Sequence, residues 1–122
     1  MILYRVMDTI EYTDFEKVDI RIGTVTEASV PEWSHWVMRL KVDLGEELGE
    51  KICFSGIMKF FKPEDLVGKQ FPFVVNLEPR KIGPEKELSE AMMIMAVPGE
   101  DEETPTILFE PQKKVENGTK VR

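Results

Sequence analysis

The sequence has one cysteine, Cys53, and one histidine, His35, among its 122 residues. A lone cysteine excludes an internal disulfide framework and any zinc site built from several cysteines. A single histidine removes most histidine-based catalysis and metal binding. The chain also lacks a glycine-rich phosphate loop, a nucleophile elbow and metal-ligand spacing. We therefore expect no enzyme, no cofactor and no bound metal.

Long apolar runs are missing as well. No stretch is long and apolar enough to cross a bilayer, so we expect no membrane insertion. Residues 1–12 carry Arg5, Asp8 and Glu11 and lack an apolar core followed by a small-residue cleavage site, which argues against a signal peptide. Together with the scarcity of cysteine, this composition indicates a protein of the reducing cytoplasm.

Basic residues are outnumbered, with 16 lysines and arginines against 23 acids and a formal net charge of -7. An acidic balance of this kind repels phosphate at long range. The acids gather in segments 46–50 and 100–103, which we interpret as solvated loops. Any nucleic-acid site must therefore be a local basic patch.

Short segments of alternating polarity dominate the chain, and 42% hydrophobic residues suffice for one domain with one core. Gly23 breaks the alternation of the first segment, which predicts a bulge there. Cys53 has apolar neighbours and is predicted to be buried and unreactive. Segments 79–90 and 98–105 are predicted to be polar loops. The expected strands are 19–30, 37–44, 51–55, 70–77 and 91–97, with a short last strand at 106–109.

Two short helical turns accompany these strands. Thr13-Asp14-Phe15-Glu16 has capping-box spacing and predicts a turn before the first strand. Pro63, followed by two acids, predicts a turn over 63–66. Five strands with a helical turn between the third and fourth predict an all-β, five-stranded OB-fold barrel. We expect one domain, 1–122, in which 13–97 form the barrel while 1–12 and 98–122 are terminal extensions.

Several motifs resemble those of the tRNA-binding domain family. The first is Asp14-Phe15-Glu16-Lys17-Val18-Asp19-Ile20-Arg21-Ile22-Gly23-Thr24-Val25, and the others, in family order, are Ser55-Gly56-Ile57, 63–69 and 75–83. Each match is weak alone, but together they span about two-thirds of the chain. The family includes the C-terminal appendix of many methionyl-tRNA synthetases, free-standing structure-specific tRNA-binding proteins and CsaA-type secretion chaperones. The resemblance implies an OB-fold that binds tRNA independently of its sequence.

One stretch resembles the CsaA-type branch, namely Pro31-Glu32-Trp33-Ser34-His35-Trp36-Val37-Met38-Arg39-Leu40. Terminal segments build a symmetric dimer in the free-standing members, so the resemblance implies a homodimer. Met7-Asp8-Thr9 looks like the beginning of shorter relatives, which leaves Met1 and Met7 as alternative starts. Ala91 replaces a family glycine in a loop that contacts nucleic acid in relatives. A Cβ atom there would restrict close backbone approach.

Candidate nucleic-acid-binding residues follow from this resemblance and from side-chain chemistry. Basic side chains pair with phosphates, and polar ones hydrogen-bond to RNA. Asn76 either faces the ligand or holds its own loop through backbone hydrogen bonds. Met92 either contacts the ligand or, slightly favoured, joins Met93 and Met95 in the core. The predicted set is Arg21, Lys59, Lys62, Asn76, Arg80, Lys81, Lys86, Ser89 and Met92.

Four aromatic residues are candidates for a second surface. Trp33 and Trp36 lie in an expected loop, where they form a peptide-binding or dimer surface, or else one of them covers the barrel mouth. Phe60 and Phe61 have a lysine on either side. They either stack on exposed bases or cap the bottom of the barrel.

Two non-enzymatic functions follow from these observations. In the first, the chain is a dimeric cytoplasmic module that binds tRNA, with an aminoacyl-tRNA synthetase as a further candidate partner. In the second, it is a CsaA-like export chaperone that binds peptides or unfolded preproteins through an apolar surface. The acidic net charge would then favour basic peptides.

Overall fold

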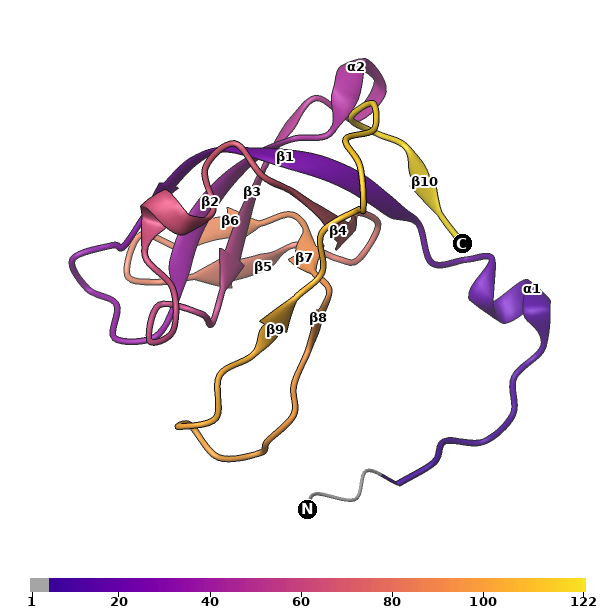
Figure 1. Cartoon of the computed structure of the whole chain (residues 1–122), viewed down its shortest axis with the longest axis horizontal. Helices are drawn as coiled ribbons and strands as arrows, with labels where there is room; N and C mark the ends of the chain where they lie inside the picture. Colours follow the sequence, from indigo (N-terminus) through magenta and orange to yellow (C-terminus); the bar gives the residue numbers. More distant parts are fainter. Residues whose placement is uncertain (1–4) are drawn as a thin grey trace.

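The computed structural model describes residues 5–122, so the alternative start Met1 lies outside the described residues. Strands dominate the chain, and the helices are single turns (Figure 1). The helical turns are α1 (Tyr12–Phe15), α2 (Gly45–Leu48) and η1 (Pro63–Asp65). The strands are β1 (Ile20–Ser29), β2 (Met38–Asp43), β3 (Glu50–Ser55), β4 (Gln70–Val74), β5 (Arg80–Ile82), β6 (Glu87–Ser89), β7 (Met92–Met93), β8 (Met95–Ala96), β9 (Ile107–Leu108) and β10 (Lys120–Val121).

Five antiparallel strands form the barrel, in the order β3-β2-β1-β4-β7. The outer strand β3 is also bonded to the residues that directly precede β7. The Glu90 N–H donates to the Ile52 carbonyl at 2.7 Å, and the Phe54 N–H donates to Ser89 Oγ at 3.0 Å. The turn η1 lies between β3 and β4, as the sequence predicts. These features confirm the predicted all-β OB-fold barrel, which is nearly closed.

Strand β1 is long because it pairs with two neighbours in succession, β4 along its first half and β2 along its second. Its register with β2 shifts between Val25 and Glu27, so the bulge predicted at Gly23 lies further along the strand. Gly23 is needed for a different reason. A Cβ atom there would lie 2.6 Å from Val42 Cγ1 and 2.7 Å from Leu44 Cδ2. The glycine therefore provides the space in which β1 packs against the core.

The core follows from the period-two pattern of the strands. In β2, Met38, Leu40 and Val42 are buried while the residues between them are half-buried. Cys53 is fully buried among these side chains, and burial raises the pKa of its thiol to about 12. The thiol therefore stays protonated at neutral pH, and its predicted burial is confirmed. The largest fully buried side chains include Phe71, Phe73, Met38, Leu40, Leu44, Ile57 and Leu66.

The C-terminal segment covers the outer face of the barrel at β4, which is buried throughout its length. The amide of buried Gln70 pairs with the backbone of Val115: Nε2 donates to the carbonyl at 2.7 Å, and Oε1 accepts from the N–H at 3.0 Å. Strand β10 then pairs with β1, with Val121 opposite Ile20. Residues 110–121, expected as part of an extension, are thus tied to the barrel at both ends.

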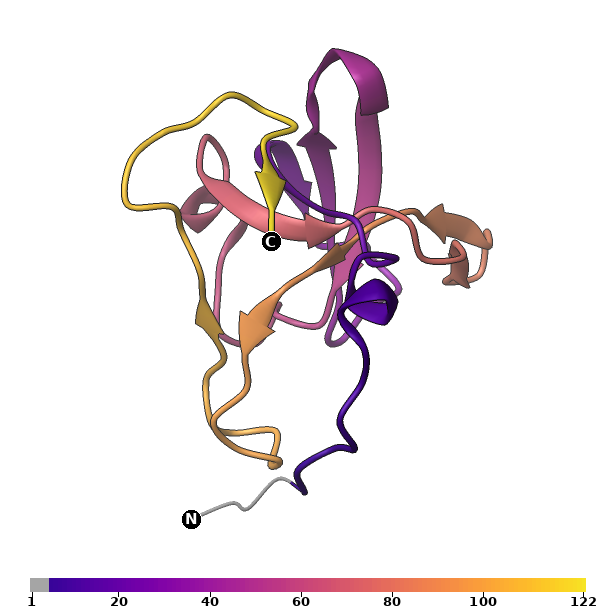
Figure 2. The same cartoon turned by 90° about the vertical axis from the view of Figure 1, so that its right-hand side faces the viewer.

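Three local expectations are wrong. The predicted helical turn before the first strand is present as α1, but its cap is Glu11 and not Thr13, with the Glu11 N–H donating to Asp14 Oδ2 at 3.3 Å, so the turn begins at Tyr12. The expected strand 91–97 is divided because β8 leaves the barrel to pair with β9 (Figure 2). The expected loop 79–90 contains the hairpin β5–β6, which pairs with no other strand among the described residues.

Candidate nucleic-acid interface

The hairpin β5–β6 carries three of the predicted basic residues, Arg80, Lys81 and Lys86. Its four-residue loop runs from Gly83 to Lys86 and closes with the Lys86 N–H donating to the Gly83 carbonyl at 3.1 Å. Lys86 has a φ of 56°, and among the described residues it is the one non-glycine with positive φ. This left-handed conformation costs a lysine about 1 kcal/mol. Such an outlier beside exposed basic residues motivates a functional hypothesis for the loop.

Arg80 and Lys81 do not share a face, although both are exposed. Successive strand residues point to opposite sides of the sheet. Arg80 pairs with Ser89 and therefore faces the barrel, because the Ser89 side chain bonds to β3. Lys81 faces away from it. One flat ligand surface would therefore meet these two side chains unequally.

Arg80 borders a groove of about 170 Å³ between the hairpin and the barrel. Exposed Leu77 and Met92 line the same groove, with Phe54 at its floor. Met92 is 49% exposed, whereas its neighbour Met93 is buried. The slight preference for Met92 in the core is therefore wrong, because adjacent residues of β7 point to opposite faces. A basic side chain beside accessible apolar groups suits a phosphate with an unstacked base.

Ala91, which replaces a family glycine, is buried in the core cluster. Its side chain therefore packs mainly into the barrel, although Ala91 also lines the groove that Arg80 borders. The effect of this departure from the family pattern on nucleic-acid binding stays a prediction.

Two polar residues of the predicted set are engaged with the backbone. The Asn76 side chain accepts from the Asp19 N–H at 2.8 Å and donates to the Lys17 carbonyl at 2.6 Å. Ser89 Oγ accepts from the Phe54 N–H. These bonds favour the interpretation that Asn76 holds its loop in place. For both residues, a direct contact with nucleic acid stays a prediction.

Two acids at the hairpin, Glu87 and Glu90, are paired with groups of the barrel. The Arg39 guanidinium of β2 donates to both carboxylate oxygens of Glu87, at 2.8 and 2.7 Å. Glu90 accepts from the Ile52 N–H at 3.1 Å and lies 3.9 Å from Lys51 Nζ. Arg80, Lys81 and Lys86 are therefore exposed beside two acids that already have partners, while Glu85 of the same loop is exposed as well.

The Arg39–Glu87 pair predicts a pH dependence of stability. The hydrogen bond from Arg39 lowers the pKa of Glu87 below its ordinary value, while partial burial opposes this. A carboxylate whose pKa is lowered on folding stabilises the protein above its unfolded pKa, and this contribution is lost as pH falls through the folded pKa. Glu87→Gln should therefore cost about 0.5–1 kcal/mol near pH 7 and almost nothing near pH 3, measured by urea unfolding.

The matched control for this measurement is Glu85→Gln, which removes an exposed carboxylate from the same loop. It should change the free energy of unfolding by less than about 0.5 kcal/mol at pH 7. A Glu87→Gln difference that stays constant between pH 7 and pH 3 would contradict the prediction.

Arg21 lies apart from the hairpin, at the β1–β10 pairing. Its guanidinium donates to Asp19 at 2.6 Å and to the Gly118 carbonyl at 3.1 Å, and Lys120 lies 3.4 Å from the same Asp19. Hydrogen bonding from Arg21 lowers the pKa of the Asp19 carboxyl, although partial burial opposes this. Arg21 therefore ties the C-terminal strand to the barrel, and its contact with nucleic acid stays a prediction.

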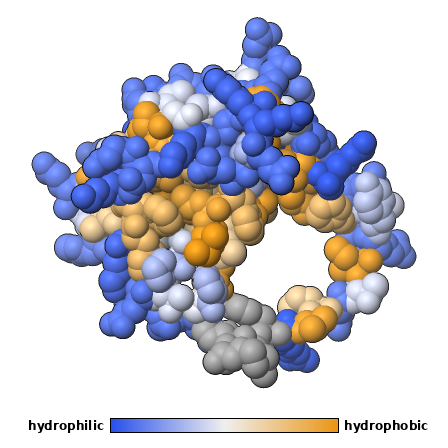
Figure 3. Space-filling model, viewed as in Figure 1, coloured by the Kyte–Doolittle hydropathy of each residue, from blue (hydrophilic) through white to orange (hydrophobic). Residues whose placement is uncertain are grey.

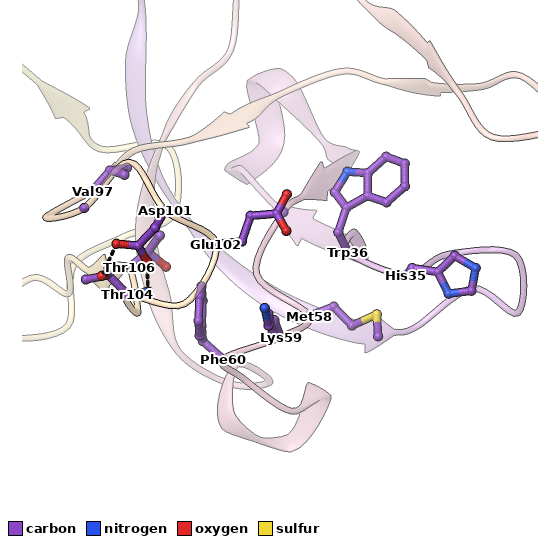
Figure 4. A pocket seen from close by; sticks show the side chains of 12 residues that line it. His35, Trp36, Met58, Lys59, Phe60, Val97, Asp101, Glu102, Thr104 and Thr106 are labelled. Carbon is purple, nitrogen blue, oxygen red and sulfur yellow. Dashed lines mark hydrogen bonds between the residues drawn. The ribbon is translucent and has the colours of Figure 1, made fainter.

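Lys59 and Lys62 lie on a different element, the segment between β3 and η1. Lys59 and Phe60 line a hollow of about 710 Å³ (Figure 4). Phe61 packs against the core, as one of its two interpretations predicts. The structure thus divides the predicted basic set between the hairpin, this segment and the β10 end of β1.

The two tryptophans have different environments. Trp33 is half-buried, with its ring centroid 6.2 Å from that of Phe54. Trp36 is 62% exposed and lines the hollow beside Phe60. Trp33 thus packs against Phe54 of β3, while Trp36 is exposed to solvent; a role of either in binding a partner stays a prediction.

Sequence reasoning missed Arg39 as part of this site. Its partner Glu87 is 48 residues away, so no local pattern joins them. The polar, apolar, polar order of Glu87, Leu88 and Ser89 fits the second hairpin strand, but three residues are too few to distinguish a strand from a polar loop. Within residues 5–122, no cluster of His, Cys, Asp and Glu could hold a metal ion. Over the same residues, no helix has the length and apolar character to cross a membrane.

Known proteins resemble this chain in sequence. The family model described as a putative tRNA binding domain matches residues 20–120, from β1 to β10. The chain belongs to this tRNA-binding domain family. A methionine–tRNA ligase of Methanocaldococcus jannaschii is 40% identical over 116 residues, which are 95% of this chain and 17% of the ligase. The chain spans less than a fifth of the curated ligases that it matches.

Solved structures of tRNA-binding domain relatives confirm the recognised family and its fold. The chaperone CsaA of Bacillus anthracis has a TM-score of 0.79 and 36% identity, covering 94% of this chain and all of that one. A MetRS-related protein of Pyrococcus horikoshii has a TM-score of 0.82 and 31% identity, covering 95% of this chain and all of that one. The chain is thus similar both to CsaA and to a synthetase-related protein.

Proposed function

We propose that this tRNA-binding domain binds tRNA through the β5–β6 hairpin and the groove beside it. The supporting observation is that Arg80, Lys81 and Lys86 project on one hairpin while Glu87 and Glu90 are paired with groups of the barrel. Phosphate contacts position a protein on nucleic acid without reading its sequence. Recognition therefore rests on the shape of the folded RNA and on charge. The module has no catalytic activity of its own.

The net charge of -7 does not prevent this binding. Exposed charges farther apart than about 10 Å are largely screened at 0.1 M salt. At contact distance, the electrostatic energy of an RNA phosphate is set mainly by the charged side chains of the hairpin. The long-range repulsion instead lowers the association rate at low salt.

The experiment is a titration with bulk tRNA and with duplex DNA of matched length, at about 50 and 200 mM salt, by fluorescence anisotropy. We expect tighter binding of tRNA and an affinity that falls steeply with salt. Equal affinities for the two nucleic acids would remove the shape-specific part of the proposal. No binding of either at low salt would overturn it.

The proposed binding unit is a cytoplasmic homodimer. Residues 5–11 are exposed and stand away from the barrel (Figures 1 and 3). Apolar Met7 is 82% exposed, and Ile107 of β9 is also exposed. Large exposed apolar side chains favour a protein contact. Sedimentation should give twice the mass of the chain for the full protein, and the monomer mass after removal of residues 1–11.

Two RNA-binding faces on one dimer would raise its avidity for a folded RNA. Similarity to methionine–tRNA ligases over nearly the whole chain makes such a synthetase a further candidate partner. Co-sedimentation of this chain with a methionyl-tRNA synthetase tests that association, and separate migration at micromolar concentrations would exclude it.

A second function is favoured by the hollow of about 710 Å³ in Figure 4. Trp36, Met58 and Phe60 give it an apolar wall, and Asp101 and Glu102 line it from the other side together with one cation, Lys59. This combination suits a peptide with an apolar side chain next to a basic one, as a CsaA-like chaperone of preproteins would bind. Trp36 fluorescence in a Trp33→Phe background should respond to such a peptide and not to its Lys→Glu counterpart. Equal responses would remove this candidate.

A further inference from the structure

The β5–β6 hairpin cannot hold its own position. It is a two-stranded ribbon that pairs with no third strand among the described residues, and it projects from the barrel (Figure 2). A lone two-stranded hairpin is at best marginally stable in water. The direction in which Arg80 and Lys86 point must therefore be set by contacts between the hairpin and the barrel.

The first such contact is at the hairpin tip, where Trp33 packs directly on Gly83. A Cβ atom on Gly83 would lie 2.5 Å from Cζ2 of Trp33, so the indole fills the place of a side chain. The other side of Trp33 faces Phe54 of β3. Gly83 also has a φ of 76°, which disfavours other residues. The tip is thus anchored to the barrel through an aromatic ring.

The second contact is the pair between Arg39 and Glu87, at the start of β6. Two parallel hydrogen bonds join the guanidinium and the carboxylate, a geometry that fixes orientation as well as distance. The third contact is at the end of β6, where Ser89 bonds to the backbone of β3. The three contacts are spread along the hairpin, so together they restrain both its tilt and its rotation.

We propose that Trp33 and Arg39 are positioning residues for tRNA binding, which hold the basic hairpin ready without touching the RNA. This inference rests on the proposed function. A preformed arm binds with a smaller entropy cost than one that must be ordered on contact. Neither residue needs to meet a phosphate, because Arg39 is already occupied by Glu87 and Trp33 is covered by Gly83.

Charge reversal separates positioning from simple electrostatics. Glu87→Arg adds positive charge beside the RNA, so electrostatics alone predict tighter binding. If Arg39 positions the hairpin, binding should instead weaken by about 3- to 10-fold. The arginine side chains at 39 and 87 would then repel each other across the Arg39–Glu87 contact, which we call the clamp. Arg39→Glu should weaken binding as well. The double variant Arg39→Glu with Glu87→Arg rebuilds the pair in reverse and should return the Kd to within about 2-fold of wild type.

Glu110→Arg is the matched control, since it makes the same charge change at an exposed ion pair with Lys69. It should leave tRNA affinity unchanged or slightly increased. If Glu87→Arg also leaves affinity unchanged or increases it, or if the double variant binds no better than Arg39→Glu alone, the positioning role is overturned.

Amide hydrogen exchange of the RNA-free protein tests the clamp separately. Residues 80–82 and 87–89 should exchange at least about 5-fold faster in Glu87→Arg than in wild type, with β1 unaffected. Unchanged exchange in a folded variant overturns the clamp even if tRNA binds. If wild-type protein binds no tRNA, the proposed function fails and the positioning role with it. If the Glu87→Arg hairpin still exchanges faster in that case, the clamp is correct and only the proposed contact with RNA is wrong.

Discussion

Replacing Arg80 and Lys81 together with alanine is expected to weaken tRNA binding by about 10- to 100-fold at low salt. Each lost phosphate contact also lowers the slope of log affinity against log salt by about one unit. The single variants should be unequal. Arg80→Ala should have the larger effect because Arg80 borders the groove with Met92, whereas Lys81 is on the outer face. Anisotropy titrations at several salt concentrations measure both quantities.

The matched control replaces Lys113 and Lys114, two adjacent exposed lysines of the C-terminal segment. This control removes the same charge at a distant place in the sequence, so long-range electrostatics change similarly. We expect an affinity within about 3-fold of wild type and an unchanged salt slope. Equal losses from the two double variants would mean that net charge, and not the hairpin, governs binding.

Gly23→Ala is expected to have the largest effect on stability, about 2–3 kcal/mol in the free energy of unfolding. The added methyl group would lie 2.6 Å from Val42 and 2.7 Å from Leu44, both fully packed in the core, and 3.1 Å from the Asp43 carbonyl oxygen. Backbone conformation is not the reason, because Gly23 has no positive φ. Urea unfolding of the folded variant measures the loss directly.

Gly56→Ala is the control for this substitution. Gly56 also has no positive φ, and the nearest atom to its added Cβ, Trp36 Cδ1, is at an ordinary contact distance of 3.7 Å. Its stability should change by less than about 0.5 kcal/mol. In the double variant of Gly23→Ala with Leu44→Ala, the two costs should be less than additive, because the shortened side chain makes room. Strict additivity would mean that the methyl group is accommodated elsewhere.

Much of the fold follows from local pattern. The alternation in 38–43 and the proline and acids at 63–65 predict β2 and η1 because strand period and helix capping depend on near neighbours in sequence. The bulge is different. Gly23 interrupts the pattern, but its role is to let β1 pack over Val42 and Leu44, residues that only the folded barrel brings near it. A glycine in the sequence does not identify the residue that packs against it in the folded protein.

The candidate site was predicted more fully in its residue types than in its geometry. Arg80 and Lys81 come from a family motif and Lys86 from its basic side chain, and all three lie on one hairpin. Their segment was nevertheless expected to be a loop. Three-residue strands carry too little periodicity to be distinguished from a polar loop. The division of Arg80 and Lys81 between opposite faces depends on that strand geometry.

The sequence alone determined the family, most strands of the barrel and the chemistry available at the surface, because motif spacing and polarity patterns are properties of the linear chain. The tertiary structure decided which of those groups remain free to bind. It placed Asn76 and Ser89 against the backbone, and Arg21 and Arg39 against carboxylates. Hydrogen bonds and ion pairs are made between groups that are close in space, and these partners lie 2 to 59 residues apart in sequence.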